Sequence, residues 1–171
     1  VPEPFRKFAD VWSIQIHSGL IFFQTFRQVM VYDGKKITAF PFDESIEKMF
    51  IFENRIYLQF KSAHFSVYKD NTFTPQLILK GMKGDVVDIC KLKDGRTFIA
   101  TYKDGIYQYD GNTCRPIDIT ASSHMSNIWI SSMKVLSDGN LIIGTSNKGV
   151  LLITPQLNSL LNLRKENGLQ N

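Results

Sequence analysis

Two stretches of this chain repeat nearly the same pattern 44 residues apart. Each begins with an Asp-Gly pair, Asp94-Gly95 or Asp138-Gly139, and continues as a short apolar run that ends in a threonine, Thr101 or Thr145. Asp-Gly pairs suit tight hairpins because such turns need positive φ angles. A repeat of this length that contains only strand and turn signals predicts a β-propeller or another stacked array of sheets.

Extension of this pattern along the chain gives four units. Their third strands end at Tyr32, Tyr68, Tyr109 and Ile153, with spacings of 36, 41 and 44 residues. We predict an all-β chain of about four four-stranded antiparallel propeller blades, with units at approximately 10–45, 46–84, 85–127 and 128–165 inside one propeller segment that covers residues 1–171. Residues 166–171 resemble the start of a further repeat, which predicts a piece of an incomplete propeller.

Each unit is expected to contain four strands separated by turn residues. The first strands are predicted at Trp12–His17, Lys48–Phe52, Val86–Leu92 and Ile130–Leu136, and the second at Leu20–Thr25, Arg55–Phe60, Thr97–Thr101 and Leu141–Thr145. The third strands are predicted at Val29–Tyr32, Phe65–Tyr68, Ile106–Tyr109 and Val150–Ile153, and the last at Lys36–Phe40, Phe73–Leu79, Cys114–Ile119 and Leu157–Leu163. The leucine spacing of the final segment also fits a short helix, but the repeat register favours a strand.

Composition supports a packed soluble domain. Hydrophobic residues make up 43% of the chain, with 13 Phe and 6 Tyr, which is enough for a core and typical of β structure. The net charge of +4 is spread without a block of like charges, so we expect no nucleic-acid partner. No apolar run is long enough to span a bilayer, so we expect no membrane contact by this segment.

The two cysteines fall on the predicted first and last strands of one unit, Cys90 and Cys114. Neighbouring strands lie about 4.8 Å apart, so residues three strands away are too distant for a disulfide. We therefore predict two free thiols.

The chain lacks recognisable catalytic or metal-binding motifs. The three histidines His17, His64 and His124 are not at metal-ligand spacing, and there is no nucleophile elbow, phosphate loop or dinucleotide motif. Most aspartates occupy predicted turns, where they accept hydrogen bonds from nearby backbone amides. We expect no metal, no cofactor and no catalytic residue.

The loops that join one unit to the next are the places where such scaffolds usually bind ligands. We predict them at Pro41–Glu47, Lys80–Asp85 and Thr120–Asn127. A tryptophan can form a flat platform for a sugar ring, and nearby polar groups can bind its hydroxyls or carboxylates. The candidate ligand-binding residues are Trp12, Asp43, Glu44, Lys83, Asp85, His124, Asn127 and Trp129. The alternative for the two tryptophans, which we favour, is packing within the core.

Several segments resemble the two-component regulator propeller repeats of Bacteroidetes-type membrane regulators. They are Val11–Ile14, Ile21–Phe26, Val31–Gly34, Asp138–Thr145 and the Asn-Gly-Leu tail in Glu166–Asn171. The resemblance covers nearly the whole chain and is clearest in units three and four. In the first two units Gln24 and Phe60 stand where the threonine is expected, and Gln28 and His64 stand where the glycine is expected.

The resemblance implies a function. In this family, which includes hybrid histidine kinases and triple-tyrosine-motif transcriptional regulators, the repeats form a periplasmic sensor region of an inner-membrane protein. We therefore expect a non-catalytic sensor segment that binds an oligosaccharide or another small ligand or transmits that signal. Its open blade faces are expected to associate with a second copy. The alternatives are a protein-interaction scaffold and a polysaccharide-cleaving enzyme.

Overall fold

The computed structural model describes residues 10–117 and 127–163, which form strands, turns and loops without a helix. Sixteen strands pair into four separate four-stranded antiparallel sheets, each with its strands in chain order. This meander is the topology of a propeller blade, so the predicted fold class is confirmed. The chain divides into two compact units, Val1–Ile78 and Leu79–Asn171, here called unit 1 and unit 2.

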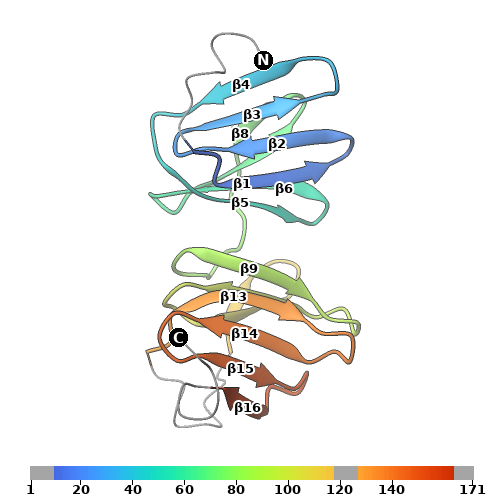
Figure 1. Cartoon of the computed structure of the whole chain (residues 1–171), viewed down its shortest axis with the longest axis vertical. Coiled ribbons are helices and arrows are strands. Elements are labelled where there is room, and N and C mark those ends of the chain that lie inside the picture. The colour runs from blue at the N-terminus through green and yellow to red at the C-terminus, as the bar shows by residue number, and fades with distance from the viewer. Residues whose placement is uncertain (1–9, 118–126, 164–171) are drawn as a thin grey trace. The chain divides into compact units, whose positions relative to one another are not determined.

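Unit 1 contains two blades (Figure 1). Blade 1 consists of β1 (Ser13–His17), β2 (Leu20–Gln24), β3 (Gln28–Tyr32) and β4 (Ile37–Pro41). Blade 2 consists of β5 (Ile46–Phe52), β6 (Arg55–Phe60), β7 (Phe65–Lys69) and β8 (Thr72–Pro75). Strand β8 is shorter than predicted because the chain leaves the sheet after Pro75.

Unit 2 contains the other two blades. Blade 3 consists of β9 (Val86–Lys91), β10 (Thr97–Thr101), β11 (Ile106–Tyr109) and β12 (Cys114–Pro116). Blade 4 consists of β13 (Ile130–Val135), β14 (Leu141–Thr145), β15 (Val150–Ile153) and β16 (Ser159–Leu163). The final segment is a strand and not a helix, as the repeat register predicted, whereas the tail at 166–171 lies outside the described residues.

The Asp residues of the repeat cap turns. The Oδ1 atom of Asp94 accepts a hydrogen bond from the amide of Arg96 at 3.0 Å, and Oδ1 of Asp138 accepts one from the amide of Asn140 at 2.9 Å. Asp110 accepts hydrogen bonds from two amides in the same way. These interactions confirm that the aspartates of the Asp-Gly pairs serve the turns.

The repeat register in blade 1 differs from the prediction by one residue. Both the amide and the hydroxyl of Thr101 donate to the carbonyl of Gly105, and Thr145 makes the same pair of bonds to Gly149. In blade 1 this pair is made by Thr25, which donates to the carbonyl of Gln28 at 2.8 and 3.1 Å. Thr25, and not Gln24, is therefore the equivalent threonine, because the following loop is one residue shorter.

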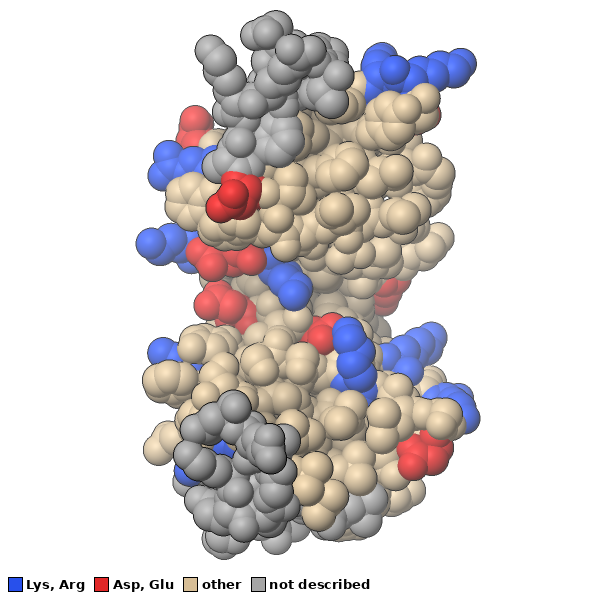
Figure 2. All heavy atoms as spheres, viewed as in Figure 1, with Lys and Arg blue, Asp and Glu red and all other residues tan. Residues whose placement is uncertain are grey.

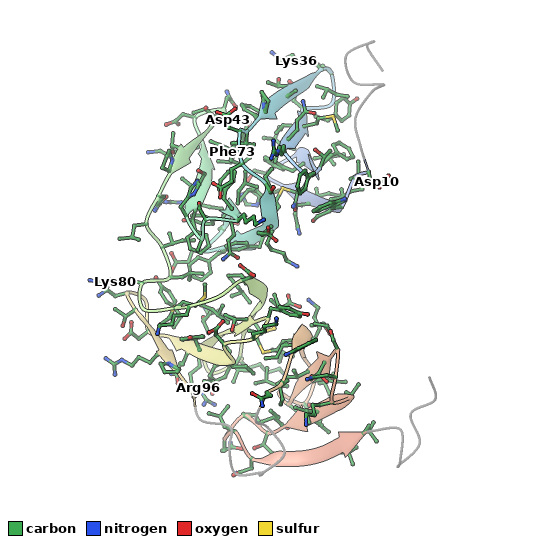
Figure 3. The ribbon with its side chains drawn as sticks, turned by 90° about the vertical axis from the view of Figure 1, so that its left-hand side faces the viewer. Asp10, Lys36, Asp43, Phe73, Lys80 and Arg96 are labelled. Atoms are coloured by element: carbon green, nitrogen blue, oxygen red, sulfur yellow. The ribbon has the colours of Figure 1, made fainter. Side chains whose placement is uncertain are left out.

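The core of unit 1 lies between its two sheets. Phe22, Val29 and Val31 on one face of blade 1 form a buried cluster with Met49, Leu58 and other residues of blade 2. We call the face of a blade that packs on the preceding blade its leading face, and the opposite face its trailing face. At the outer strands, Phe73 packs edge-on against Phe40 and Phe42, with ring centroids 5.4 and 5.7 Å apart (Figure 3).

Unit 2 repeats this arrangement. The trailing face of blade 3, with Phe98 and Ala100, packs on the leading face of blade 4, with Met133 and Ile143. Polar contacts join the same two blades. The thiol of Cys90 lies 3.2 Å from the carbonyl oxygen of Met133, and the guanidinium of Arg96, labelled in Figure 3, donates to the carbonyl of Pro155 at 2.7 Å.

The segment that opens unit 2 pairs with the outer edge of blade 3. The amide of Cys114 donates to the carbonyl of Lys80, labelled in Figure 3, at 2.6 Å. Gly81 follows with a φ of +88°, and a Cβ atom at this position would lie 2.7 Å from the carbonyl oxygen of Cys114. Only glycine fits this close backbone approach without a shift. The segment thus protects an edge strand.

No helix in the described part of the chain is long and apolar enough to cross a membrane. Cys90 and Cys114 are both free, as predicted, and both are buried.

We expect Ile143→Ala to destabilise the protein by about 2–5 kcal/mol, because the side chain is fully buried between blades 3 and 4 and truncation leaves a cavity. Exposed Leu77 provides the control, and Leu77→Ala should change the free energy of unfolding by less than about 0.5 kcal/mol. Denaturant unfolding measures both variants. Equal effects would contradict the assigned core.

We expect Cys114 to resist alkylation in the folded protein. Burial, with a smaller effect of the Asp110 carboxylate, raises the pKa of the Cys114 thiol to about 11. A raised pKa keeps the thiol protonated and unreactive at the pH of an ordinary labelling reaction. Iodoacetamide labelling followed by peptide mass spectrometry should show slow modification of Cys114 at neutral pH and fast modification in denaturant. Fast modification of Cys114 in the native protein would contradict this assignment.

Candidate functional site

The loops between blades and the turns after the second strands meet at one end of each unit, here called the loop end. In unit 1 the amide of Ile46 donates to the carbonyl of Phe26 at 2.9 Å. In unit 2 the amide of Ile130 donates to the carbonyl of Tyr102 at 2.9 Å, and the amide of Tyr102 donates to the carbonyl of Asp85 at 3.0 Å. These backbone bonds give the loop side chains defined positions.

An aromatic and cationic cluster occupies the loop end of unit 2. The rings of Trp129 and Tyr102 are tilted by 47° with centroids 6.0 Å apart. The ammonium of Lys103 lies 4.8 Å from the centroid of Trp129 and 5.2 Å from that of Tyr102. Both distances are within the range of a cation–π interaction. We call these three residues the Trp129 cluster.

Asn147 holds the backbone beside the Trp129 cluster. Its Oδ1 atom accepts a hydrogen bond from the amide of Trp129 at 3.0 Å, and its Nδ2 atom donates to the carbonyl of Asn127 at 2.8 Å. The carbonyl of Trp129 accepts a further bond from the amide of Ser146 at 2.8 Å. The position of the Trp129 backbone therefore depends on the turn after β14.

The loop end of unit 1 carries a comparable group. Trp12 and Phe26 have ring centroids 5.4 Å apart, and the guanidinium carbon of Arg27 lies 5.6 Å from the centroid of Phe26. Phe26-Arg27 follows Thr25 as Tyr102-Lys103 follows Thr101. Each unit thus presents an aromatic residue and a cation directly after an equivalent threonine, beside a tryptophan.

The expectation that both tryptophans pack in the core is wrong. The exposed fraction is 56% for Trp12 and 42% for Trp129. Each residue lies just before the first strand of its blade, where the sheet ends, so its ring contacts neighbouring loop side chains and solvent. Their exposed rings are accessible, and their use as ligand platforms stays a prediction.

Glu44, a candidate ligand contact, is tied into a loop contact within unit 1. Its carboxylate accepts hydrogen bonds from the amide of Ser62 and from the Ser62 hydroxyl, the latter at 2.9 Å. His64 Nδ1 lies 3.4 Å from Glu44 Oε2 and 2.5 Å from Ser62 Oγ. The His64 ring stacks on Phe60 with centroids 4.4 Å apart and an angle of 11° between the planes.

This group has a different order from that of a serine hydrolase. In such enzymes the histidine lies between the serine and the carboxylate, whereas here the Ser62 hydroxyl lies between His64 and Glu44. Partial burial raises the pKa of Glu44, but the Ser62 hydrogen bonds and the charge of His64 outweigh it, so the pKa is lowered overall. The ionised Glu44 carboxylate thus connects the loop between blades 1 and 2 to the turn after β6.

The remaining candidate residues are distributed between the two units. Asp43 is exposed in the loop between blades 1 and 2, and Lys83 and Asp85 are exposed in the loop before β9. Asn127 is exposed and joins Trp129 through Asn147, whereas His124 lies outside the described residues. The structure therefore brings Asn127 and Trp129 together, and it adds Tyr102, Lys103 and Asn147, which the sequence analysis did not select.

We also compared the charged side chains and possible metal ligands of the two units. On the visible face of each unit, basic and acidic side chains lie mainly toward the margins, and both signs are present (Figure 2). Within residues 10–117 and 127–163, there is no group of three or more His, Cys, Asp or Glu residues placed to hold a metal ion.

No family model and no curated protein matches the chain. Solved structures do match it. The extracellular domain assigned to a hybrid two-component system, BT4673, from B. thetaiotaomicron has a TM-score of 0.68 and 19% identity, with 91% of this chain and 22% of that chain covered.

Two further matches have other functions. The inactive H270A variant of virginiamycin B lyase from Staphylococcus aureus, with quinupristin, has a TM-score of 0.65 and 13% identity over 94% of this chain and 58% of that chain. YCF48 bound to a D1 peptide has a TM-score of 0.58 and 11% identity over 90% of this chain and 53% of that chain. The chain therefore spans between about a fifth and three fifths of these proteins. At these identities the likeness shows the propeller fold.

We expect Asn147→Ala to loosen the Trp129 cluster at a cost of about 1 kcal/mol, because it removes both hydrogen bonds that hold the backbone at Trp129 and Asn127. In a Trp12→Phe background Trp129 is the single tryptophan. Acrylamide quenching should increase in the Asn147→Ala variant. Exposed Asn112 lies in the turn between β11 and β12, at the opposite end of blade 3 from Lys103, and Asn112→Ala is the control. Equal quenching in both variants would contradict the assigned role.

Proposed function

We propose that the chain is an extracytoplasmic sensor segment of a membrane-bound signal-transduction regulator, and that it binds a ligand without catalysis. The observation that carries this proposal is the exposed Trp129 cluster at the loop end of a propeller unit. Similarity in fold to an extracellular domain of a two-component system supports the location and the class. The repeats that resemble those of membrane regulators support it independently.

The chemistry of the cluster favours a glycan fragment as ligand. The exposed part of Trp129 is a flat apolar surface of the kind that packs on the apolar face of a sugar ring. Lys103 adds a cation beside the ring, and Asn127 adds an exposed amide next to it. A ring contact with polar groups at its edge orients a ligand of this type.

Signal transmission requires that the ligand favours one arrangement of the protein over another. Binding at the loop end would restrain residues 127–129 together with the turn after β14, since Asn147 already connects them. We infer that this restraint changes how the segment packs with its neighbours in the complete regulator, which is how a binding event couples to a distant output.

A protein-interaction scaffold is the second candidate, since the same loop end would also accept a peptide. Its supporting observation is the similar fold of YCF48 bound to a D1 peptide. An enzyme that cleaves polysaccharides is the third candidate. Its supporting observation is the similar fold of virginiamycin B lyase. The aspartates in the turns and Glu44 accept local hydrogen bonds, so these carboxylates do not form the acid and base pair that polysaccharide cleavage requires.

The test is binding of neutral and uronate-containing oligosaccharides to the chain, measured by calorimetry. We expect at least one oligosaccharide to bind and Trp129→Ala to weaken it by about tenfold or more, whereas the control Leu77→Ala leaves affinity unchanged. In cells, Trp129→Ala in the complete gene should reduce the response to that oligosaccharide. Release of reducing sugar would favour the enzyme, and binding of peptides alone would favour the scaffold.

A further inference from the structure

The leading face of blade 1 is apolar, and it is exposed along β1 and partly exposed along β2. Ile14 and Ile16 lie on the same face of β1, with exposed fractions of 57% and 69%. They pair across the sheet with Phe23 and Ile21 of β2, which continue the apolar surface. In Figure 2 the part of unit 1 over the sheet of blade 1 carries few charged side chains. Adjacent exposed apolar residues of this size mark interaction surfaces more often than ordinary surface.

The equivalent faces of two other blades show what covers such a surface. Ile14 pairs with Phe23 as Met49 pairs with Leu58 in blade 2 and as Met133 pairs with Ile143 in blade 4. Met49 and Met133 are both fully buried. In each case the covering surface is the trailing face of the preceding blade in the same unit. The Ile14 face therefore has the residues and the register of a surface that accepts a trailing face.

The trailing face of blade 4 has the complementary chemistry. Ile142 pairs with Leu152, and Leu152 with exposed Leu161, so these side chains share one face. Ile142 and Leu152 are equivalent in register to Phe22 and Val31 of blade 1, which are buried under blade 2. Ile142 and Leu152 are instead half-buried. An aliphatic trailing face is thus accessible on the same chain that carries an accessible leading face.

We propose that the leading face of blade 1 docks the trailing face of blade 4 of a second copy of this chain. The occupant is a second copy because the chain itself joins this kind of leading and trailing face twice, between blades 1 and 2 and between blades 3 and 4. Stacked repeats interact mainly with their nearest neighbours through one type of contact. The proposal is independent of the sensor function.

The contact is head-to-tail. Two different surfaces meet in it, so it is heterologous, whereas contact between two leading faces would be isologous. The distinction matters for the experiment, because a heterologous contact is lost when either surface is changed in all copies.

Sedimentation velocity over a range of concentrations tests the proposal. The unchanged chain should associate, and either Ile14→Asp or Leu161→Asp should raise the dissociation constant by about tenfold or more, because each buries an unpaired carboxylate in the contact. Leu77→Asp is the matched control, since Leu77 is exposed and lies outside both faces, and it should leave association unchanged. Circular dichroism verifies folding, and Ile16→Asp replaces any Ile14 variant that is unfolded.

A mixture of the two variants tests the head-to-tail arrangement. The Leu161→Asp protein keeps an intact blade 1 face and the Ile14→Asp protein keeps an intact blade 4 face, so an equimolar mixture should form a dimer although neither variant associates alone. A monomer at every concentration of the unchanged chain would overturn the proposal, as would association that survives Ile14→Asp and Ile16→Asp. Loss of association in the Ile14 variant with none in the Leu161 variant would indicate an isologous contact and would also overturn it.

Discussion

Apolar packing between neighbouring blades is the interaction on which the rest of this structure depends. A four-stranded sheet with large apolar side chains on both faces is not stable alone in water. Phe22 of blade 1 and Leu58 of blade 2 are buried in one such contact, and Phe98 of blade 3 and Ile143 of blade 4 in another. Each fully buried side chain of this size contributes about 1.5–3 kcal/mol relative to exposure. The loops within residues 10–117 connect sheets that this packing holds in place.

Much of the fold could be predicted because the repeated turn residues show where one strand ends and its hydrogen-bonded neighbour begins. The Asp-Gly pairs and the apolar runs after them located β10 and β14 with the correct ends, since each turn type and its flanking strands are specified by nearby residues. The last strands were less accurate. β8 ends at Pro75, four residues before the predicted end, because an outer strand has a neighbour on one side only and its length depends on the local path of the chain. Likewise, the prediction assigned the threonine position of blade 1 to Gln24 and not to Thr25, because the loop that follows is one residue shorter than in blades 3 and 4.

The candidate site was harder to predict because it depends on contacts between distant residues. Trp129 was selected, but Asn147, which hydrogen-bonds its backbone, is 18 residues away. Asn147 lies in the turn after β14, which the sequence analysis treated as part of the scaffold. Glu44 was selected for its position in a loop, yet Ser62 and His64 hold its carboxylate. One local signal was available. An aromatic residue and a cation follow the threonine in Phe26-Arg27 and again in Tyr102-Lys103, and both pairs lie beside a tryptophan.

Hydrogen exchange of a Phe98→Ala variant tests the central claim most directly, because Phe98 lies in blade 3 and its side chain is buried in the core that blade 3 shares with blade 4. If the packing between blades stabilises the sheets, amides of β13 and β14 in blade 4 should lose protection together with those of β9 and β10. If each blade were stable by itself, exchange would accelerate in blade 3 alone, and protection in blade 4 would stay as in the unchanged protein. That second result would contradict the account.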